Sequence, residues 1–397
     1  MSKMKRVFLV VLACFLIVGI CSCGNNGEEV DTSAIEGSAA DTTENMDDDG
    51  DESDTIEAEG ATFALNSSTT EVRFFGEREV KDNGYFSCNY PGSGFESKLK
   101  CDGGTVSVRI MAEGECSFLV FLDGKLQKNT DGNDFFTTIG NRLIGIENVA
   151  AGEHVLKIIR ATDFGIDAKI YALIFAGELL AADNANQERT FVEFIGDGVC
   201  STVGAVGFTD NVSVTYPYLI AQQMDVDYSI TAYNGYGLAS TETKLGDLYG
   251  AEDSGSFTRK ADIAVINVGA LDVLSTGVNA VTSDKFANAY KELVKKVRLI
   301  NGNNCKIVLV CTNGNDDFRN AVSNLYDGLG GEDSGYYLAM LPTSTSVPPS
   351  KSDHEAYASA LMKILNEVQD YQVKPITSEQ SGAGDSVAFD SDKWEVI

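Results

Sequence analysis

Residue types that can do chemistry follow short apolar runs in the second half of the chain. Asp197 comes directly after the run FVEFIG, and the potential nucleophiles Cys200 and Ser201 follow it closely. Asp272 ends another such segment, and His354 is one of only two histidines. Two chemical interpretations are open. Cys200 and His354 could form a nucleophile–base pair, or Asp197 and Asp272 could be paired carboxylates of the kind that hydrolyse sugars.

The same residues also have structural interpretations, which we favour. The helix expected after the first run carries Cys200 away from the tip of the turn, where a nucleophile must lie. His354 opens the last predicted helix and suits a helix terminus. Asp197 and Asp272 suit the capping of tight turns. His154, the other histidine, lies in a predicted strand and is interpreted as structural or surface-exposed.

The elements that position these residues alternate between strand and helix over residues 188–372. Five apolar runs have strand length, and two segments between or after them have helical periodicity. On the helix expected at 283–300, capped by Ser283 or Asp284, and on that at 352–368, one face carries the apolar residues Phe286, Tyr290, Leu293, Val294, Val297, Tyr357, Leu361, Ile364 and Leu365. This alternation predicts an α/β/α domain with a parallel sheet, in which ligands bind beyond the carboxyl ends of the strands.

Residues 71–182 have a different pattern. Seven or eight short runs are rich in β-branched and aromatic residues, and turn signals such as Asp-Gly separate them. No convincing helix interrupts these runs. We therefore predict a β-sandwich domain here, of the jelly-roll type.

The turns after the α/β strands resemble the sequence blocks of SGNH (GDSL-type) hydrolases. In order, they read GDG, NGYG, GALD, CTNGND and LPTSTSVPPSKSDH. In the preceding domain, FFGER, YPGSGFE, VFLDGK and AGEHVLKIIRATD resemble the N-terminal jelly roll of carbohydrate esterase family 2. That family joins such a domain to an SGNH domain and removes acetyl groups from plant polysaccharides. The resemblance covers nearly all of residues 71–370.

The resemblance also shows that the catalytic positions are degenerate. Gly198 stands where the family has its nucleophilic Ser, and Leu271 stands where an Asn donates to the oxyanion. Pro348 occupies the position of the His base, Ser346 that of its Asp partner, and His354 that of a second His. Gly cannot attack an ester, Leu cannot donate a hydrogen bond, and Pro cannot accept a proton. The resemblance therefore implies that the esterase fold is retained while its catalytic residues are missing.

What remains at the blocks suits binding. The candidate ligand-binding residues are Asp197, Asn234, Gly235, Tyr236 and Asp272. By the resemblance, Gly235 holds the second oxyanion position and still offers its N–H. Tyrosines near the second block could stack on sugar rings, or could simply pack in the core.

Three functions follow as hypotheses. The first is a non-catalytic protein that binds a polysaccharide or oligosaccharide on an esterase scaffold. The second is an active SGNH-type acetylesterase that uses non-standard residues, and the third is a structural or interaction protein of the cell envelope. None of them calls for a cofactor or a metal.

The two ends of the chain predict its location. Residues 1–22 have a basic start and an apolar run, and Ile20-Cys21-Ser22-Cys23 fits a bacterial lipoprotein signal with the lipid on Cys23. A plain secretory signal is the alternative. Residues 23–70 and 373–397 are acidic and expected to be disordered, as a tether and a tail. The protein is thus expected to be extracytoplasmic, lipid-anchored to a membrane and exposed at the cell surface.

Charge and cysteine content exclude other classes of protein. A formal charge of −29 disfavours nucleic acid as a partner, because phosphate binding needs basic patches. No C-x-x-C pair is present, which argues against a zinc site. One disulfide in each domain is possible, although buried thiols are the default. The cysteines concerned are Cys88, Cys101, Cys116, Cys200, Cys305 and Cys311.

Overall fold

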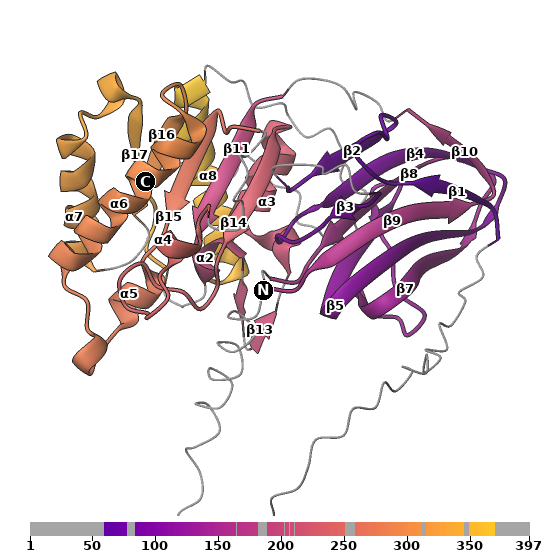
Figure 1. Ribbon diagram of the computed structural model, residues 1–397, viewed down its shortest axis with the longest axis horizontal. Coiled ribbons are helices and arrows are strands. Elements are labelled where there is room, and N and C mark those ends of the chain that lie inside the picture. Colours follow the sequence, from indigo (N-terminus) through magenta and orange to yellow (C-terminus); the bar gives the residue numbers. More distant parts are fainter. Residues whose placement is uncertain are drawn as a thin grey trace, which may run out of the picture. The chain divides into compact units, whose positions relative to one another are not determined.

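The computed structural model describes most of the chain between residues 59 and 369. The described residues are 59–77, 84–163, 165–181, 189–201, 203–205, 207–209, 211–250, 259–311, 315–344 and 349–369. They form an antiparallel sheet followed by a parallel sheet with helices, as Figure 1 shows. The predictions for residues 1–22, for lipid on Cys23, for most of the tether and for the tail lie outside the described residues.

The first part is all-β, as the sequence predicted, and its paired strands are antiparallel. Its described strands are β1 (Ala61–Ala64), β2 (Val72–Phe75), β3 (Phe86–Ser87), β4 (Gly94–Cys101), β5 (Gly104–Leu122), β6 (Lys125–Leu126), β7 (Phe136–Val149), β8 (Gly152–Arg160), β9 (Ala168–Phe175) and β10 (Gly177–Leu180). They are hydrogen-bonded into one curled sheet in the order β1-β9-β5-β8-β4-β10, with β2, β3, β6 and β7 on its branches. The long strand β5 lies in the middle of this order and joins its two halves, because its first half pairs with β9 and its second half with β8.

This sheet begins earlier than the sequence predicted. The tether was expected to reach residue 70, but β1 pairs with β9, and the rings of Phe63 and Phe175 lie 4.9 Å apart. Pairing satisfies the backbone groups of β1, and the ring contact anchors it. Composition concealed this strand, because the acidic segment continues to Glu59.

The second part has the predicted parallel sheet. Its strand order is β14-β11-β15-β16-β17, and every neighbouring pair is parallel. The strands are β11 (Phe191–Gly196), β14 (Asp227–Ala232), β15 (Ile263–Asn267), β16 (Lys306–Cys311) and β17 (Tyr336–Met340). A separate small ladder joins β12 (Val203–Ala205) to β13 (Gly207–Thr209).

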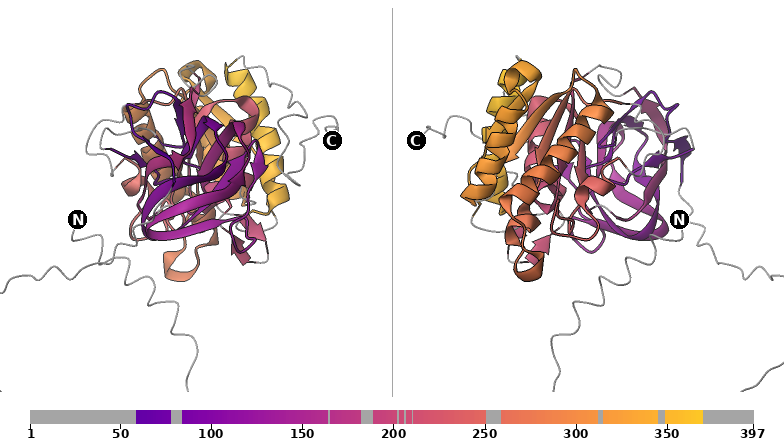
Figure 2. Two further views of the ribbon diagram at one scale, coloured as in Figure 1. Left: turned by 90° about the vertical axis from the view of Figure 1, so that its right-hand side faces the viewer. Right: turned by 60° about the vertical axis from the view of Figure 1, so that its left-hand side comes forward.

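Helices cover both faces of the parallel sheet (Figure 2). The helices are α2 (Gly198–Ser201), α3 (Tyr216–Met224), α4 (Leu245–Leu248), α5 (Ala270–Leu274), α6 (Ser283–Asn301), α7 (Asp316–Gly328) and α8 (Lys351–Gln369). Helices α3 and α8 pack on one face, and α6 and α7 pack on the other. None of the helices among the described residues is both long and apolar enough to cross a membrane.

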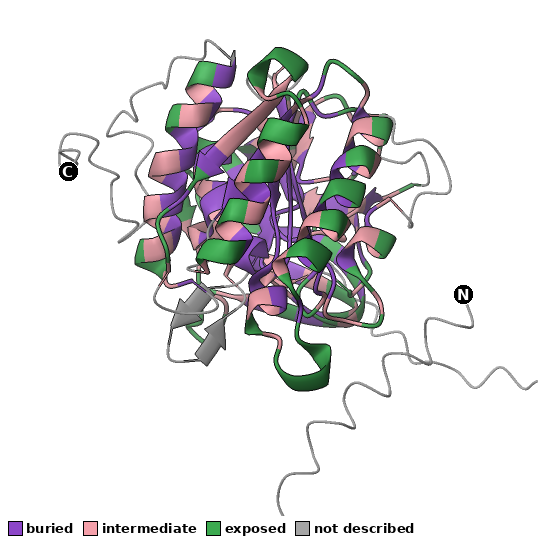
Figure 3. Ribbon diagram, turned by 90° about the vertical axis from the view of Figure 1, so that its left-hand side faces the viewer, coloured by how far each residue is buried: buried purple, intermediate pink, exposed green. Residues whose placement is uncertain are grey.

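The long helices bury the faces that their periodicity predicted. All five apolar residues predicted for α6 are buried, and Tyr357, Leu361 and Leu365 are buried on α8. Figure 3 shows the buried residues on the strands and on the inner sides of the helices. The cap of α6 is a correction: the side chain of Thr282, not Ser283 or Asp284, accepts from the Lys285 N–H.

The two sheets meet where β2 approaches β14. The Gly76 N–H donates to the Tyr228 carbonyl at 3.0 Å, and Gly76 forms a bridge with Ser229. The Tyr228 hydroxyl donates to the Gly92 carbonyl at 2.8 Å, and its ring stacks on Phe75. One hydrophobic cluster therefore contains residues of both sheets.

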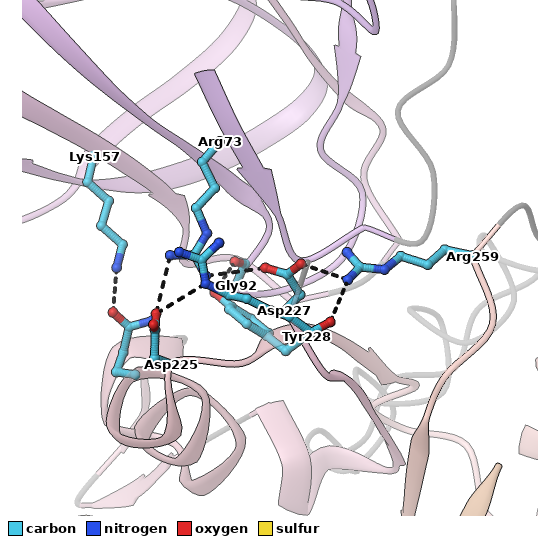
Figure 4. Close-up of polar contacts among 9 residues, drawn as sticks. Arg73, Gly92, Lys157, Asp225, Asp227, Tyr228 and Arg259 are labelled. Carbon is cyan, nitrogen blue, oxygen red and sulfur yellow. Dashed lines mark hydrogen bonds and ion pairs between the residues drawn. The ribbon is translucent and has the colours of Figure 1, made fainter. Parts of the chain in front are cut away.

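Ion pairs and polar contacts surround this contact (Figure 4). Arg73 of β2 contacts Asp227 of β14 at 3.2 Å and Asp225 at 3.7 Å. Arg259 contacts the other oxygen of Asp227 at 2.7 Å. Lys157 of β8 donates to the Gln222 side chain of α3. The contacts of Arg73 and Lys157 connect the two sheets, whereas the Arg259–Asp227 pair lies within the parallel-sheet part.

Candidate functional site

The first turn follows β11 and leaves no room for a side chain at residue 196 unless neighbouring atoms shift. A Cβ added to Gly196 would lie 2.0 Å from Cys200 Sγ and 2.6 Å from the Asn267 carbonyl oxygen. Such distances are far inside van der Waals contact. The absent side chain lets Gly196 lie directly beside Asn267 at the end of β15, and α2 begins two residues later at Gly198.

Asp197 fastens this turn to the turn after β15. Its Oδ1 accepts from the Val199 N–H at 3.0 Å, and its Oδ2 accepts from the N–H groups of Gly269 at 3.0 Å and Ala270 at 2.9 Å. Asp197 is only 1 % exposed. Burial raises its pKa to about 6, against the lowering effect of these hydrogen bonds, while the nearby Asp272 raises it further.

Asp272 fastens the turn after β15 to the segment after β14. Its carboxylate accepts from the backbone N–H groups of Leu238, Ala239 and Ser240 at 2.8, 2.7 and 2.8 Å. The prediction that Asp197 and Asp272 cap turns is therefore confirmed. Their oxygens are held by backbone donors and buried, so neither carboxylate reaches a sugar without breaking those bonds.

The other three binding candidates lie in the turn after β14, next to the first turn. Asn234 and Gly235 are exposed, and Tyr236 is half-buried. Gly235 has a φ of +84°, and nothing lies within 4 Å of where its Cβ would be. Tyr233, in contrast, is 1 % exposed and belongs to the core, so the packing interpretation holds for that ring.

The degenerate positions lie around the same turns where they are described. Gly198 is half-buried at the start of α2, and Leu271 is half-buried in α5. Strand register places their turns side by side, because Gly196 is opposite Ala232 and Asn267. Ser346 and Pro348 lie outside the described residues.

The proposed Cys200–His354 pair is not formed. Cys200 is fully buried, its Sγ is 3.0 Å from the Tyr216 hydroxyl, and burial raises the pKa of its thiol well above the usual value. His354 is also fully buried, and its Nδ1 accepts from the Tyr216 backbone N–H at 3.2 Å. The two side chains thus contact opposite ends of Tyr216. Ser201 is only 1 % exposed.

The structural interpretations of both histidines are confirmed. His354 lies in the first turns of α8, where its ring stacks on Tyr216. His154 lies in β8, where Nδ1 is 2.7 Å from Asp123 Oδ2 and Nε2 is 3.0 Å from the Ala150 carbonyl. The hydrogen bond to Asp123 raises the pKa of His154. Neither imidazole stands at the turns of the candidate site.

The described cysteines and the possible metal ligands also show no sign of a special chemical role. All six cysteines of the described residues are buried and form no disulfide with one another, as the default interpretation predicted. Over the same described ranges, no group of three His, Cys, Asp or Glu side chains is arranged to hold a metal ion.

A buried polar network under the sheet was missed by the sequence analysis. Glu193 is fully buried in β11 and accepts from the Tyr249 hydroxyl at 2.9 Å, the Thr231 hydroxyl at 3.1 Å and Asn301 Nδ2 at 3.3 Å. The available signal was a single charged residue inside the apolar run FVEFIG. Nothing in the sequence marked its partners, which lie far away along the chain.

The raised pKa of Asp197 predicts a pH dependence of stability. A folded-state pKa of about 6, above the usual 3.8, means that this group contributes stability below about pH 4 and that the contribution is lost as pH rises through 6. Between pH 4 and pH 7 the free energy of unfolding should therefore fall by about 2–3 kcal/mol more in the wild type than in Asp197→Asn. Urea unfolding at several pH values measures this difference.

The difference between the two proteins isolates Asp197 from other groups. Burial also raises the pKa of Glu77, to about 7, and Glu77 acts in the same direction in both proteins. Parallel stability curves for wild type and variant would contradict the assignment.

Comparison with known proteins identifies the fold. No protein-family model matches the sequence, and no curated protein matches it. The chain is similar to a family two carbohydrate esterase from Clostridium thermocellum in complex with cellohexaose. The TM-score is 0.66 at 20% identity, over 76% of this chain and 100% of that chain.

Two further solved structures are similar. An acetyl xylan esterase from the rumen bacterium Butyrivibrio proteoclasticus has a TM-score of 0.63 at 15% identity, over 77% of this chain and 98% of that chain. A carbohydrate esterase whose active site displays divergent catalytic and non-catalytic binding functions has a TM-score of 0.57 at 17% identity, over 78% and 98%. The chain therefore has the fold of the family 2 carbohydrate esterases, with an SGNH/GDSL-like parallel-sheet part.

Proposed function

We propose that this chain is a non-catalytic carbohydrate-binding lipoprotein built on an acetylesterase scaffold. One observation carries the proposal: the position that the first turn offers to a nucleophile is Gly198, which has no side chain. The turns around it are nevertheless held in place by the two buried carboxylates of Asp197 and Asp272. The scaffold is thus kept while the attacking group is missing.

The neighbouring side chains support the absence of hydrolysis. Ester hydrolysis needs a nucleophile that a base can activate. Cys200 and Ser201 are buried away from the turn surface, and His354 is engaged by the Tyr216 backbone. The half-buried Leu271 presents hydrocarbon where a donor for the oxyanion would be needed.

The exposed residues support binding of a polysaccharide or oligosaccharide. Asn234 offers an amide, Gly235 an accessible backbone, and Tyr236 a half-buried ring with a polar tip. Among the similar structures, one holds cellohexaose and another has an active site with a non-catalytic binding function. Oligosaccharide binding is the property that we carry over to this chain.

The proposal includes the location and the domain plan. We propose that residues 1–22 are removed, that Cys23 carries the lipid that anchors the protein to a membrane, and that an acidic tether presents the folded part at the cell surface. The antiparallel part is proposed to be a jelly roll that precedes the SGNH-like domain of residues 188–372.

Activity is tested first. The purified protein is expected to hydrolyse 4-nitrophenyl acetate no faster than a heat-treated sample, because it lacks both nucleophile and base. The double variant Gly198→Ser/Pro348→His is assayed beside it. Turnover by the unmodified protein would contradict the proposal and favour an active esterase with non-standard residues.

Binding is tested next, with soluble xylan, glucan and cellohexaose in affinity electrophoresis and calorimetry. Tyr236→Ala is expected to weaken binding about tenfold, because a lost ring contact of about 1.4 kcal/mol gives that factor. Tyr326→Ala, which changes a half-buried ring on α7, serves as the matched control. If no glycan binds to the unmodified protein, the envelope-interaction hypothesis replaces this one.

A further inference from the structure

Among the described residues, no carboxylate pairs with Arg319, although the protein is strongly acidic. Arg319 lies in α7 and is half-buried, and only its Nη1 donates hydrogen bonds, to the carbonyls of Cys311 and Leu341 at 3.3 Å each. Its Nε and Nη2 have no partner within the described part of the chain. In contrast, Arg73 and Arg259 are both paired with Asp227.

A small hollow adjoins this arginine on the α6–α7 face of the parallel sheet. Its walls come from the ends of β15 and β16, from α6 and from α7. Apart from Arg319, the lining residues are apolar or carry a thiol: Val268, Phe286, Val310, Cys311, Phe318 and Val322. The space is about the size of one water molecule or one methyl group. None of its lining residues belongs to the turn that carries Asn234 and Gly235.

We propose that this hollow binds a short-chain monocarboxylate, with acetate as the best-fitting member. The carboxylate would accept from the uncommitted edge of the Arg319 guanidinium, whose planar fork suits two parallel hydrogen bonds. The methyl group would enter the apolar hollow. This site is independent of the proposed glycan binding.

The chemistry of the walls explains why a carboxylate with a short tail fits. An isolated water molecule in this space would find few polar partners, because most of the lining is hydrocarbon. An inorganic anion would satisfy Arg319 but leave the hollow unfilled. A longer acyl chain would collide with Phe318 and Val322, which are 7 % and 3 % exposed in a packed core.

The experiment measures acetate and formate binding to the whole protein by calorimetry at constant ionic strength. Acetate is expected to bind in the millimolar range and about fourfold more tightly than formate, because it buries one more methyl group. Arg319→Gln is expected to abolish acetate binding, and Arg319→Lys to weaken it, because the ammonium lacks the planar fork. Lys291→Gln, which removes an exposed cation of α6, is the control and should bind acetate normally.

A second variant keeps the test valid if Arg319→Gln unfolds. Val322→Ile adds one methyl group to the wall and is expected to reduce acetate affinity to that of formate. Equal binding of acetate and formate to the wild type would overturn the proposal, as would acetate binding that survives both Arg319→Gln and Val322→Ile. Loss of glycan binding in other variants leaves this result unaffected.

Discussion

Gly196→Ala is expected to lower the free energy of unfolding by about 4 kcal/mol or more, the largest effect of any single methyl group near the site. The added carbon would lie 2.0 Å from Cys200 Sγ and 2.6 Å from the Asn267 carbonyl oxygen. The thiol is buried, and the carbonyl belongs to the backbone of β15, so neither can move far. Urea unfolding followed by circular dichroism measures the loss.

Two further variants make this prediction specific. Gly246→Ala adds a methyl group that meets only Leu238, at 4.0 Å, and should change stability by less than about 1 kcal/mol. Cys200→Ala combined with Gly196→Ala removes the sulfur contact but not the carbonyl contact, so only part of the stability should return. A Gly196→Ala protein as stable as the Gly246→Ala protein would show that the turn is not packed as described.

Asp272→Ala is expected to cost about 3–5 kcal/mol, because three backbone N–H groups lose their acceptor at once. The N–H groups of Leu238 and Ala239 lie in buried residues, where water does not replace the carboxylate. The segment they belong to continues the turn of Asn234 and Gly235, so the variant should also lose any glycan affinity. Thermal unfolding and calorimetry measure the two effects.

The matched control for this variant is Asp284→Ala. Asp284 is exposed in the first turn of α6, where its charge favours the helix by only a few tenths of a kcal/mol. Asp272→Asn keeps one oxygen as an acceptor and should fall between wild type and Asp272→Ala. An Asp272→Ala protein as stable as Asp284→Ala would remove the structural role assigned to the carboxylate.

Local patterns in the sequence predicted much of the α/β part. On α6, the period of Phe286, Tyr290 and Val297 identified the buried face, because helix geometry alone puts these residues on one side. The strand order and the short strand β1 could not be predicted in the same way. Both depend on which distant segment a strand pairs with, and neither pairing leaves a mark in the local sequence.

The turns of the candidate site could be predicted from the sequence, but the buried residues that pack behind them could not. The glycines and carboxylates of the turns have a recognisable spacing, and their capping role followed from residue type. Tyr216 was missed, although it touches Cys200 with its hydroxyl and His354 with its backbone N–H. A tyrosine in the segment TYPYLIAQQM has no feature that distinguishes it from other core residues, and only the fold places it between Cys200 and His354.

The contact between the two sheets limits how this chain can be recombined. Phe75 and Tyr228 stack across it, and the hydrophobic cluster around them takes residues from β2, β8 and α3 alike. Cutting the chain between β10 and β11 would expose a hydrophobic surface on each half. It would also separate charged partners such as Arg73 and Asp227. Neither half is therefore expected to fold as a separate domain. A segment transferred to another protein must contain both halves.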